Sequence, residues 1–302
     1  MAPRKIIAFA ALCLVWGSTW MAIRILVEQV PPIRSAALRF AIAVMVLVPI
    51  LIARRVKLPR GRALVANLVL SATMIAVPYA LIFWAETRVS SGMTAVLFAA
   101  MPLVAGLYAN YMDGRQMPYS AMLALMLGVG GMLLVLSSAF STSLDQAVGA
   151  IVVLAAVVSA GVSSVYAKRE LEAVNPLMST CLQLGGGAAL LSLMSAILER
   201  DQPSHWNIPA VTALMFLSLG ASVFAFPLYF WLLKEMEAYQ IGTIQWFEPL
   251  VAVAEGAILL HEPLSWRMSL GGAIILASVF RVMTVREQDD AIVTIKITGQ
   301  TD

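Results

Sequence analysis

One apolar sequence block occurs twice in this chain, and its two copies lie 147 residues apart with the same internal spacing. The first copy is Phe83–Trp84 followed by Pro102–Ala105, and the second is Phe230–Trp231 followed by Pro249–Ala252. Both copies lie inside long apolar segments. A membrane chain made of two related halves, each with prolines in its hydrophobic helices, is a construction typical of secondary transporters.

The composition places the chain in a membrane. It is 61% hydrophobic and only 12% charged, whereas a soluble domain is about half apolar and about a quarter charged. A helix of about 20 apolar residues crosses the ~30 Å hydrocarbon layer. The sequence predicts an all-α polytopic protein with ten such helices, near residues 5–27, 33–53, 63–85, 91–112, 117–138, 147–167, 176–198, 209–233, 239–260 and 265–284.

The positions of lysine and arginine predict the orientation. With the N-terminus in the cytoplasm, 14 of these residues fall on the cytoplasmic side, five fall on the other side and Arg39 lies inside a span. An excess of basic residues marks cytoplasmic loops. We therefore expect a multi-pass protein of the inner membrane with both termini in the cytoplasm.

The helix count predicts how the two halves relate to each other. Two similar halves with five helices each enter the membrane in opposite directions, so they form an inverted repeat about an axis in the membrane plane. We expect the first five-helix repeat at residues 1–142, the second at 143–285 and a polar cytoplasmic tail at 286–302.

Signatures of other function classes are missing from the sequence. It has no zinc-protease motif, no nucleophile elbow and no phosphate-binding glycine loop, so an enzyme is not expected. The only histidines are His205 and His261, and the only cysteines are Cys13 and Cys181. We expect no cofactor, no metal site and no nucleic-acid partner; the bilayer and a small-molecule substrate are the expected partners.

Prolines interrupt four of the expected helices. Pro78, Pro102, Pro227 and Pro249 lie in the third, fourth, eighth and ninth segments. A proline removes one backbone hydrogen bond and tends to kink a helix, and the freed carbonyl is tolerated in a membrane where protein or a watery cavity surrounds it. These helices are therefore candidates to line a pathway, and a purely structural bend is the alternative.

Acidic residues mark the ninth segment. Glu248 lies close to the expected midplane, with Gln245 three residues before it and Glu255 seven residues after it, on nearly the same helix face. A carboxylate in this place is costly, so a functional role is the default interpretation. A structural ion pair or an interhelical hydrogen bond is the alternative. The first-half counterpart of Glu248 is Met101, so the repeat folds without this acid.

Arg39 is the only basic residue well inside a span. Its side chain could extend to the membrane surface, bind an anionic group of a substrate, or pair with an acid such as Glu248. The sequence leaves these alternatives open.

Aromatic residues supply the remaining candidates. Trp20, Tyr79 and Trp246 are candidates to shape a binding cavity, whereas Trp84 and Trp231 lie near helix ends, where tryptophan anchors to the interface. Aromatic walls would suit amphipathic or planar organic solutes.

The sequence resembles the EamA-type branch of the drug/metabolite transporter superfamily over roughly residues 5–284. The resemblance lies in Trp16–Trp20, Leu38–Phe40, Ser90–Gly92 with Pro102, and Glu248–Pro249 with Glu262. It implies ten helices in two inverted halves around a central cavity, and transport of small organic metabolites, often export of amino acids or related compounds. Matching positions are Gly17, Ser18, Trp20, Arg39, Pro102, Glu248, Pro249 and Glu262.

The residues and the resemblance together predict a secondary transporter that works by alternating access, with coupling to protons left open. An uncoupled facilitator of the same solutes and a non-transporting membrane subunit are the alternatives. Substrate, direction, coupling ion and oligomeric state are not written in any motif of the sequence.

Overall fold

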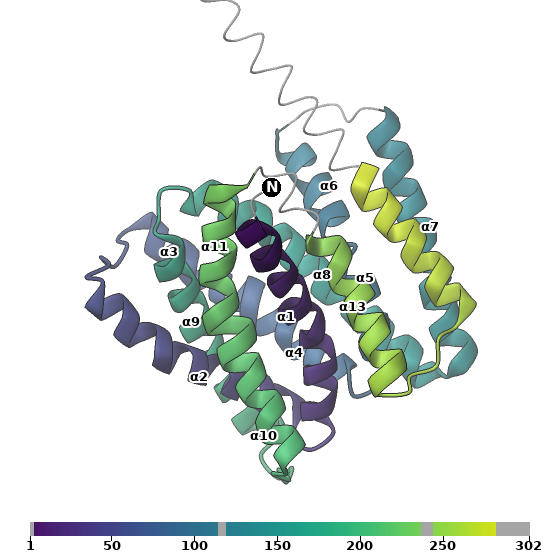
Figure 1. Cartoon of the computed structure of the whole chain (residues 1–302), viewed down its shortest axis with the longest axis horizontal. Helices are drawn as coiled ribbons and strands as arrows, with labels where there is room; N and C mark the ends of the chain where they lie inside the picture. The colour runs from purple at the N-terminus through teal and green to yellow at the C-terminus, as the bar shows by residue number, and fades with distance from the viewer. Residues whose placement is uncertain (1–2, 114–118, 237–243, 282–302) are drawn as a thin grey trace, which may run out of the picture.

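The computed structural model describes residues 3–113, 119–236 and 244–281, and every regular element in these ranges is a helix (Figure 1). The predicted all-helical architecture is therefore confirmed for the described residues. Eight helical stretches are long and apolar enough to cross a membrane: Arg4–Val27, Pro32–Ala53, Arg62–Ala85, Ser91–Met112, Met122–Thr142, Leu144–Leu171, Pro176–Leu198 and Ile208–Tyr229.

The first half of the chain contains the elements α1 to α7. They are α1 (Pro3–Val27), α2 (Pro32–Ala53), α3 (Arg62–Leu70), the π-helical stretch η1 (Ser71–Ala76), α4 (Val77–Ala85), α5 (Ser91–Phe98), α6 (Met101–Asp113) and α7 (Tyr119–Thr142).

The second half repeats this order. It contains α8 (Leu144–Leu171), α9 (Pro176–Leu198), α10 (Ile208–Met215), the π-helical stretch η2 (Phe216–Phe224), α11 (Ala225–Glu235), α13 (Ile244–Leu259) and a last helix at 266–281. α13 and the last helix begin or end next to residues outside the described ranges. Eight of the ten expected spans are therefore found among the described residues, the count of ten stays a prediction, and the tail at 286–302 lies outside the described residues.

A π-helical stretch interrupts the third span of each half just before a proline. Pro78 is the second residue of α4, directly after η1, and Pro227 is the third residue of α11, directly after η2. A proline has no N–H to donate and its ring crowds the preceding turn, so the helix cannot keep its regular hydrogen bonds there. Such wide turns inside α-helices are frequent at functional sites.

The fourth span is divided rather than continuous. α5 ends at Phe98, a turn follows at Ala99 and Ala100, and α6 begins at Met101 with Pro102 as its second residue. The start of α5 is capped by the hydroxyl of Ser90, which accepts a hydrogen bond from the Met93 amide at 3.1 Å.

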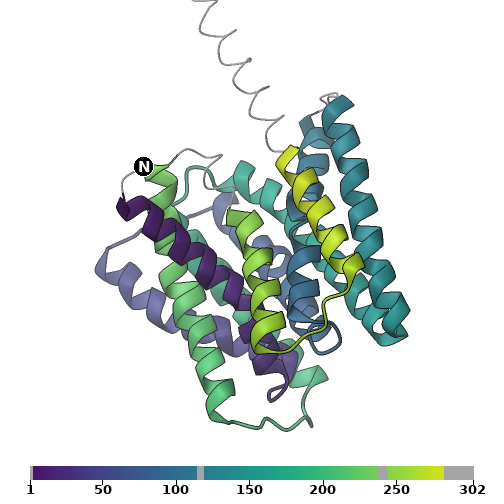
Figure 2. The ribbon, with the colours of Figure 1, turned by 45° about the vertical axis from the view of Figure 1, so that its right-hand side comes forward.

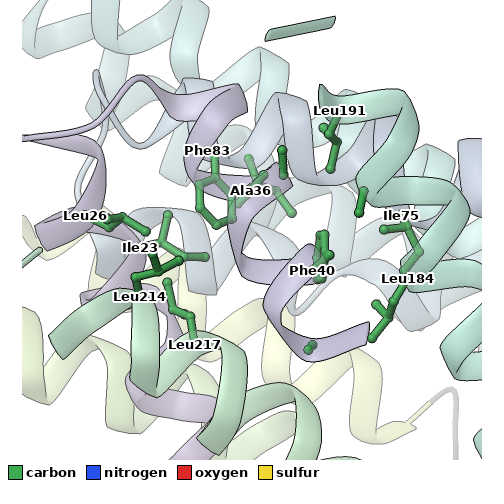
Figure 3. Packing of buried hydrophobic residues seen from close by; sticks show 14 of the residues in the cluster. Ile23, Leu26, Ala36, Phe40, Ile75, Phe83, Leu184, Leu191, Leu214 and Leu217 are labelled. Atoms are coloured by element: carbon green, nitrogen blue, oxygen red, sulfur yellow. The ribbon is translucent and has the colours of Figure 1, made fainter. Parts of the chain in front are cut away.

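The core is centred on the pair α2 and α9, which contact each other along their length and also contact η2 and η1, respectively. Figure 3 shows its side chains: Phe40 of α2, Ile75 of η1, Phe83 of α4, and Leu184 and Leu191 of α9 meet one another in the interior. Elements far apart in the sequence therefore share one core.

Two groups of helices flank this pair. On one side α1 packs on α10, α11 and α13, and on the other side α8 packs on α3, α4, α5 and α6. α7 and the last helix run side by side at the edge of the molecule (Figures 1 and 2). They meet at Gly131 and Gly271, where an added Cβ would lie 2.8 or 2.7 Å from the other residue's carbonyl oxygen. Their glycines thus serve a contact within the chain.

One close helix crossing occurs twice with the halves exchanged. A Cβ on Gly17 of α1 would lie 2.5 Å from the Cβ of Val251 and 3.2 Å from the carbonyl oxygen of Glu248 in α13. A Cβ on Gly161 of α8 would lie 2.9 Å from the Cβ of Val104 and 3.1 Å from the carbonyl oxygen of Met101 in α6. Val104 and Met101 stand 147 positions before Val251 and Glu248, so the sequence repeat is also a repeat of contacts.

Candidate functional site

Glu248 lies where α13 crosses α1, and its side chain is half-buried. The Cys13 thiol of α1 and the Tyr229 hydroxyl of α11 lie within electrostatic range of the Glu248 carboxyl group. Pro249, the next residue, is buried inside α13. The acid therefore stands at the junction of three elements, two of which belong to the second half and one to the first.

An aromatic wall lies beside this junction. The ring of Trp16 in α1 is centred 5.2 Å from the ring of Tyr229 and 6.0 Å from that of Phe226. Its indole Nε1 donates a hydrogen bond of 3.2 Å to the carbonyl oxygen of Ala221 in η2. The π-helical stretch thus offers a backbone acceptor to a neighbouring helix, as expected where regular helical bonding is lost.

Trp20 lies one turn further along α1 and is only 7% exposed. Its ring is centred 5.3 Å from that of Phe98 at the end of α5. The contact joins the first helix to the divided fourth span. Trp16, which the sequence motif contains but which was not among the predicted site residues, is the tryptophan that lies beside Tyr229.

Arg39 does not extend to the membrane surface, because only 4% of the residue is exposed. Its guanidinium lies 5.2 Å from the ring centre of Phe40 and 5.3 Å from that of Tyr79. Its Nε lies 3.4 Å from the Ser222 hydroxyl of η2. Among the described side chains it forms no ion pair, so the hypothesis of an Arg39–Glu248 pair is not met, and its Nη1 has no hydrogen-bond partner.

Tyr79 is the aromatic residue that holds Arg39. Its ring packs edge-to-face on Phe40, with ring centres 4.7 Å apart, and lies 6.4 Å from Phe83. Tyr79 follows Pro78, so the irregular third span presents this ring to α2. A buried cation against aromatic faces is stabilised by their negative π surfaces.

Two further acids lie on α13 and just after it. Glu255 accepts a hydrogen bond of 2.6 Å from the Ser18 hydroxyl of α1, and its second oxygen is buried without a partner among the described residues. Glu262 folds back at the end of α13 and accepts hydrogen bonds from the Ser91 amide at 2.9 Å, the Ser91 hydroxyl at 3.0 Å and the Gly92 amide at 3.3 Å. Glu262 therefore caps the start of α5 from the other half of the chain.

The remaining sequence candidates are placed as follows. Pro102 lies at the turn between α5 and α6, and Pro78 and Pro227 follow the π-helical stretches. Gln245 and Trp246 belong to α13, but their side chains lie outside the described part of the structure.

Two hollows border the described residues, and neither is lined by Arg39 or Glu248. The larger has a volume of about 540 Å³ and lies between α1 and η2–α11, lined by Arg4, Ala8, Val223, Phe224, Pro227, Leu228 and Trp231. The smaller, of about 250 Å³, lies between α2 and α9, beside Arg34 and Ser195. The predicted central cavity therefore stays a prediction.

Two acids at the ends of apolar segments were not predicted as site residues. Glu86 follows α4 directly and is 0% exposed, and Glu199 follows α9 and is 3% exposed. Glu199 accepts hydrogen bonds of 2.7 Å from the amides of Ile33 and Arg34 and so caps α2. In the sequence, each of these acids is marked only by its place at the end of an apolar run. An exposed loop residue often has the same place, so the sequence does not distinguish the two.

Comparison with known proteins decides the family. The model of the EamA-like transporter family matches this chain twice, at residues 3–137 and 147–284. The chain belongs to the EamA-like transporter family. The resemblance read from the sequence is thereby confirmed, and the duplicated match agrees with the repeated contacts of Gly17 and Gly161.

Several relatives cover nearly the same length as this EamA-family chain. It is 26% identical over 280 residues to the uncharacterized transporter YoaV of Bacillus subtilis, covering 92% of this chain and 96% of YoaV. It is 29% identical over 259 residues to the uncharacterized inner membrane transporter YedA of Escherichia coli, covering 85% and 83%. A solved crystal structure superposes with a TM-score of 0.62 at 18% identity over 94% of this chain and 99% of that one, which shows a shared fold.

The family and these relatives establish the coarse function. The protein is a multi-pass membrane protein of a transporter family and not an enzyme, as the absence of catalytic motifs predicts. A membrane transporter implies a small-molecule substrate and a lipid bilayer as its partners.

Proposed function

We propose that this protein is a secondary transporter that moves small organic metabolites across the inner membrane by alternating access. Amino acids or related compounds are the expected substrates and export is the expected direction, as the family resemblance implies. The observation that carries the proposal is the paired crossing of Gly17 on Val251 and Gly161 on Val104. In transporters built from repeats, alternating access is largely a rocking of one repeat or bundle against the other around a fixed site.

The proposal includes ten spans in two inverted halves with both termini in the cytoplasm. The helix order supports it, because the elements of residues 3–142 recur in the same order in residues 144–281, including a π-helical stretch in each third span. In this arrangement α1 and α4 end, and α2 and α5 begin, on the outer side of the membrane. We call this the outer end and the opposite side the inner end.

The substrate site is proposed near Glu248, at the crossing of α13 and α1. The carboxyl group would bind a proton or a cationic group such as a substrate ammonium, and the rings of Trp16 and Tyr229 would contact apolar parts of the solute. Arg39 lies apart from Glu248 against aromatic rings, so we propose it as a contact for an anionic group or as a structural residue of the α2–η2 interface.

The described contacts support an arrangement that is closed at the outer end. There, Arg24 of α1 donates to the Glu86 carbonyl after α4, and Glu262 after α13 caps α5, so the two flanking groups are tied together. At the inner end, Lys5 pairs with Glu235 at 3.1 Å and Arg62 pairs with Glu170 at 2.6 Å. Each of these inner pairs lies within a single flanking group.

The proposal is tested by transport into proteoliposomes that contain the purified protein. A panel of labelled amino acids and other small metabolites is offered with and without an imposed pH gradient. Accumulation that follows the gradient is the expected result for a proton-coupled carrier. Equilibration that ignores the gradient would favour the uncoupled facilitator, and no flux for the whole panel would favour a non-transporting membrane subunit.

A further inference from the structure

Glu86 is an acid buried in the closed outer end, and its carboxyl group has no partner in the described part of the chain. It lies one residue beyond the apolar span Arg62–Ala85 and is 0% exposed. Neither of its carboxyl oxygens has a hydrogen-bond partner among the described residues. It also follows the carboxyl end of α4, where the helix dipole is unfavourable to a negative charge.

The nearest cation does not neutralise this carboxyl group. Arg24 donates to the backbone carbonyl of Glu86, and its Nε forms an ion pair with Glu28 at 3.2 Å. Arg39 lies against Phe40 and Tyr79. Neither Arg24 nor Arg39 therefore forms an ion pair with the Glu86 carboxyl group among the described contacts.

The nearest acid makes ionisation still less favourable. Glu262 is held at the start of α5 by Ser91 and Gly92, and its charge acts on Glu86. Burial first, and then the charge of Glu262, raises the pKa of Glu86 well above its usual value, while Arg24 and Arg39 lower it by less. An unpaired, ionised carboxylate is strongly unfavourable in a buried place, so burial favours the neutral form of this carboxyl group.

We propose that Glu86 is a proton-binding site of the transport cycle, which takes up a proton from the outer side as the outer end closes and releases it as that end opens. The inference rests on the proposed alternating access. It assigns a proton to Glu86 at the outer end, and not to Glu248 near the expected midplane. Opening would separate α1 from α4, admit water to the carboxyl group and free Arg24 to pair with it.

The sign of the pH effect follows from this difference between the two states. The closed state binds the proton more tightly, so low external pH favours the closed outer end and rising pH favours opening. One coupled proton changes the ratio of the two states by at most about tenfold per pH unit. The charged groups that face Glu86 are Arg24 of α1, Arg39 of α2 and Glu262 beyond α13; on its own segment, Arg88 pairs with Asp145 of α8 at 3.1 Å.

The test measures access to a thiol behind the outer end in whole cells. Both native cysteines are buried and are replaced by serine, and Thr94→Cys places a thiol at a 0% exposed position in the second turn of α5. An impermeant thiol reagent is applied at a series of external pH values from acidic to alkaline, because the pKa of a buried carboxyl group is raised. Labelling is divided by that of a Gln202→Cys protein, whose thiol is at an exposed position. This ratio removes the effect of pH on the reaction between the reagent and a thiol.

The expected result is labelling at position 94 that rises with external pH in the protein that retains Glu86. Glu86→Gln imitates the neutral acid, so its labelling should stay low and independent of pH. Asp201→Asn removes another carboxylate from the outer end at an exposed position and should leave the transition unchanged. Glu262→Gln removes the like charge beside Glu86 and should move the transition to lower pH.

The outcomes separate this inference from the proposed function. Labelling at position 94 that is present at every pH but does not change with pH would overturn the proton site and leave alternating access standing. No labelling at any pH, with Gln202→Cys labelled normally, would overturn both. If Glu86→Gln does not fold, the Glu262→Gln protein provides the test. A pH dependence of labelling that is the same with and without the Glu262 carboxylate would contradict a proton on the neighbouring Glu86.

Discussion

At the scale of single residues, the acids of this protein differ in what surrounds them. Glu199 and Glu262 accept backbone N–H groups at helix starts, whereas Glu86 has no such partner, and Glu248 lies half-buried beside Cys13 and Tyr229. A carboxylate that caps a helix is satisfied where it is. A carboxyl group without that role is free to exchange a proton or to bind a cation.

The first prediction concerns Glu248. Glu248→Gln should lower substrate uptake by roughly ten- to a hundredfold, because a hydrogen bond to a charged group contributes about 1.5–3 kcal/mol. Uptake of the substrate found in the panel measures this, with thermal unfolding as the check on folding. Glu172→Gln, at an exposed position after α8, is the matched control and should transport normally. Normal uptake by Glu248→Gln across the pH range would show that the acid has no role in transport.

At the scale of elements, two helix crossings depend on a missing side chain. Gly17 and Gly161 let α1 meet α13 and let α8 meet α6 at backbone distance, whereas nothing lies within 4 Å of a Cβ added to Gly130 of α7. The close approach of α1 to α13 at Gly17 also positions the carbonyl oxygen of Glu248, so this crossing supports the candidate site.

The second prediction tests these crossings. Gly17→Ala and Gly161→Ala should each destabilise the protein by about 1–3 kcal/mol, the usual cost of overpacking. Thermal unfolding of the purified protein in detergent gives the comparison. Gly130→Ala should be as stable as the parent or more stable, because alanine favours a helix and meets no neighbour. Equal stability of all three variants would mean that the crossings are looser than described.

The irregular elements also act through their position in each half. η1 and η2 precede Pro78 and Pro227, and the Thr73 carbonyl of η1 accepts from Ser159 as the Ala221 carbonyl of η2 accepts from Trp16. Regular helices would satisfy these carbonyls internally. The π-helical stretches are therefore where one half presents polar backbone to its neighbours.

At the scale of the whole molecule, each half packs against the other through several elements. α2 and α9 share the central core, and Glu262 of the second half caps α5 of the first. A half chain would expose both of these surfaces, which is why duplication and assembly are linked.

The third prediction concerns orientation. A green fluorescent protein fused to the C-terminus should fluoresce, because that terminus is expected in the cytoplasm. Alkaline phosphatase fused after Asp201 should be active and the same enzyme fused after Arg55 should be inactive, since phosphatase folds only outside the cytoplasm. The reverse pattern would invert the proposed outer and inner ends.

The sequence alone determined the membrane class, the helical architecture, eight spans to within a few residues and the family. These are properties of local composition and of repetition along the chain, which no tertiary contact is needed to reveal. It also singled out Glu248 and Arg39, because ionisable groups are rare in apolar segments.

Only the tertiary structure decided the partners of these residues. Arg39 meets Tyr79 and Ser222, Glu255 meets Ser18, and Glu86 is buried rather than exposed. Membrane helices are apolar on most faces, so periodicity does not show which face meets which neighbour. Contacts between helices that are more than 150 residues apart depend on the packing of the whole chain. The sequence of a single segment does not determine that packing.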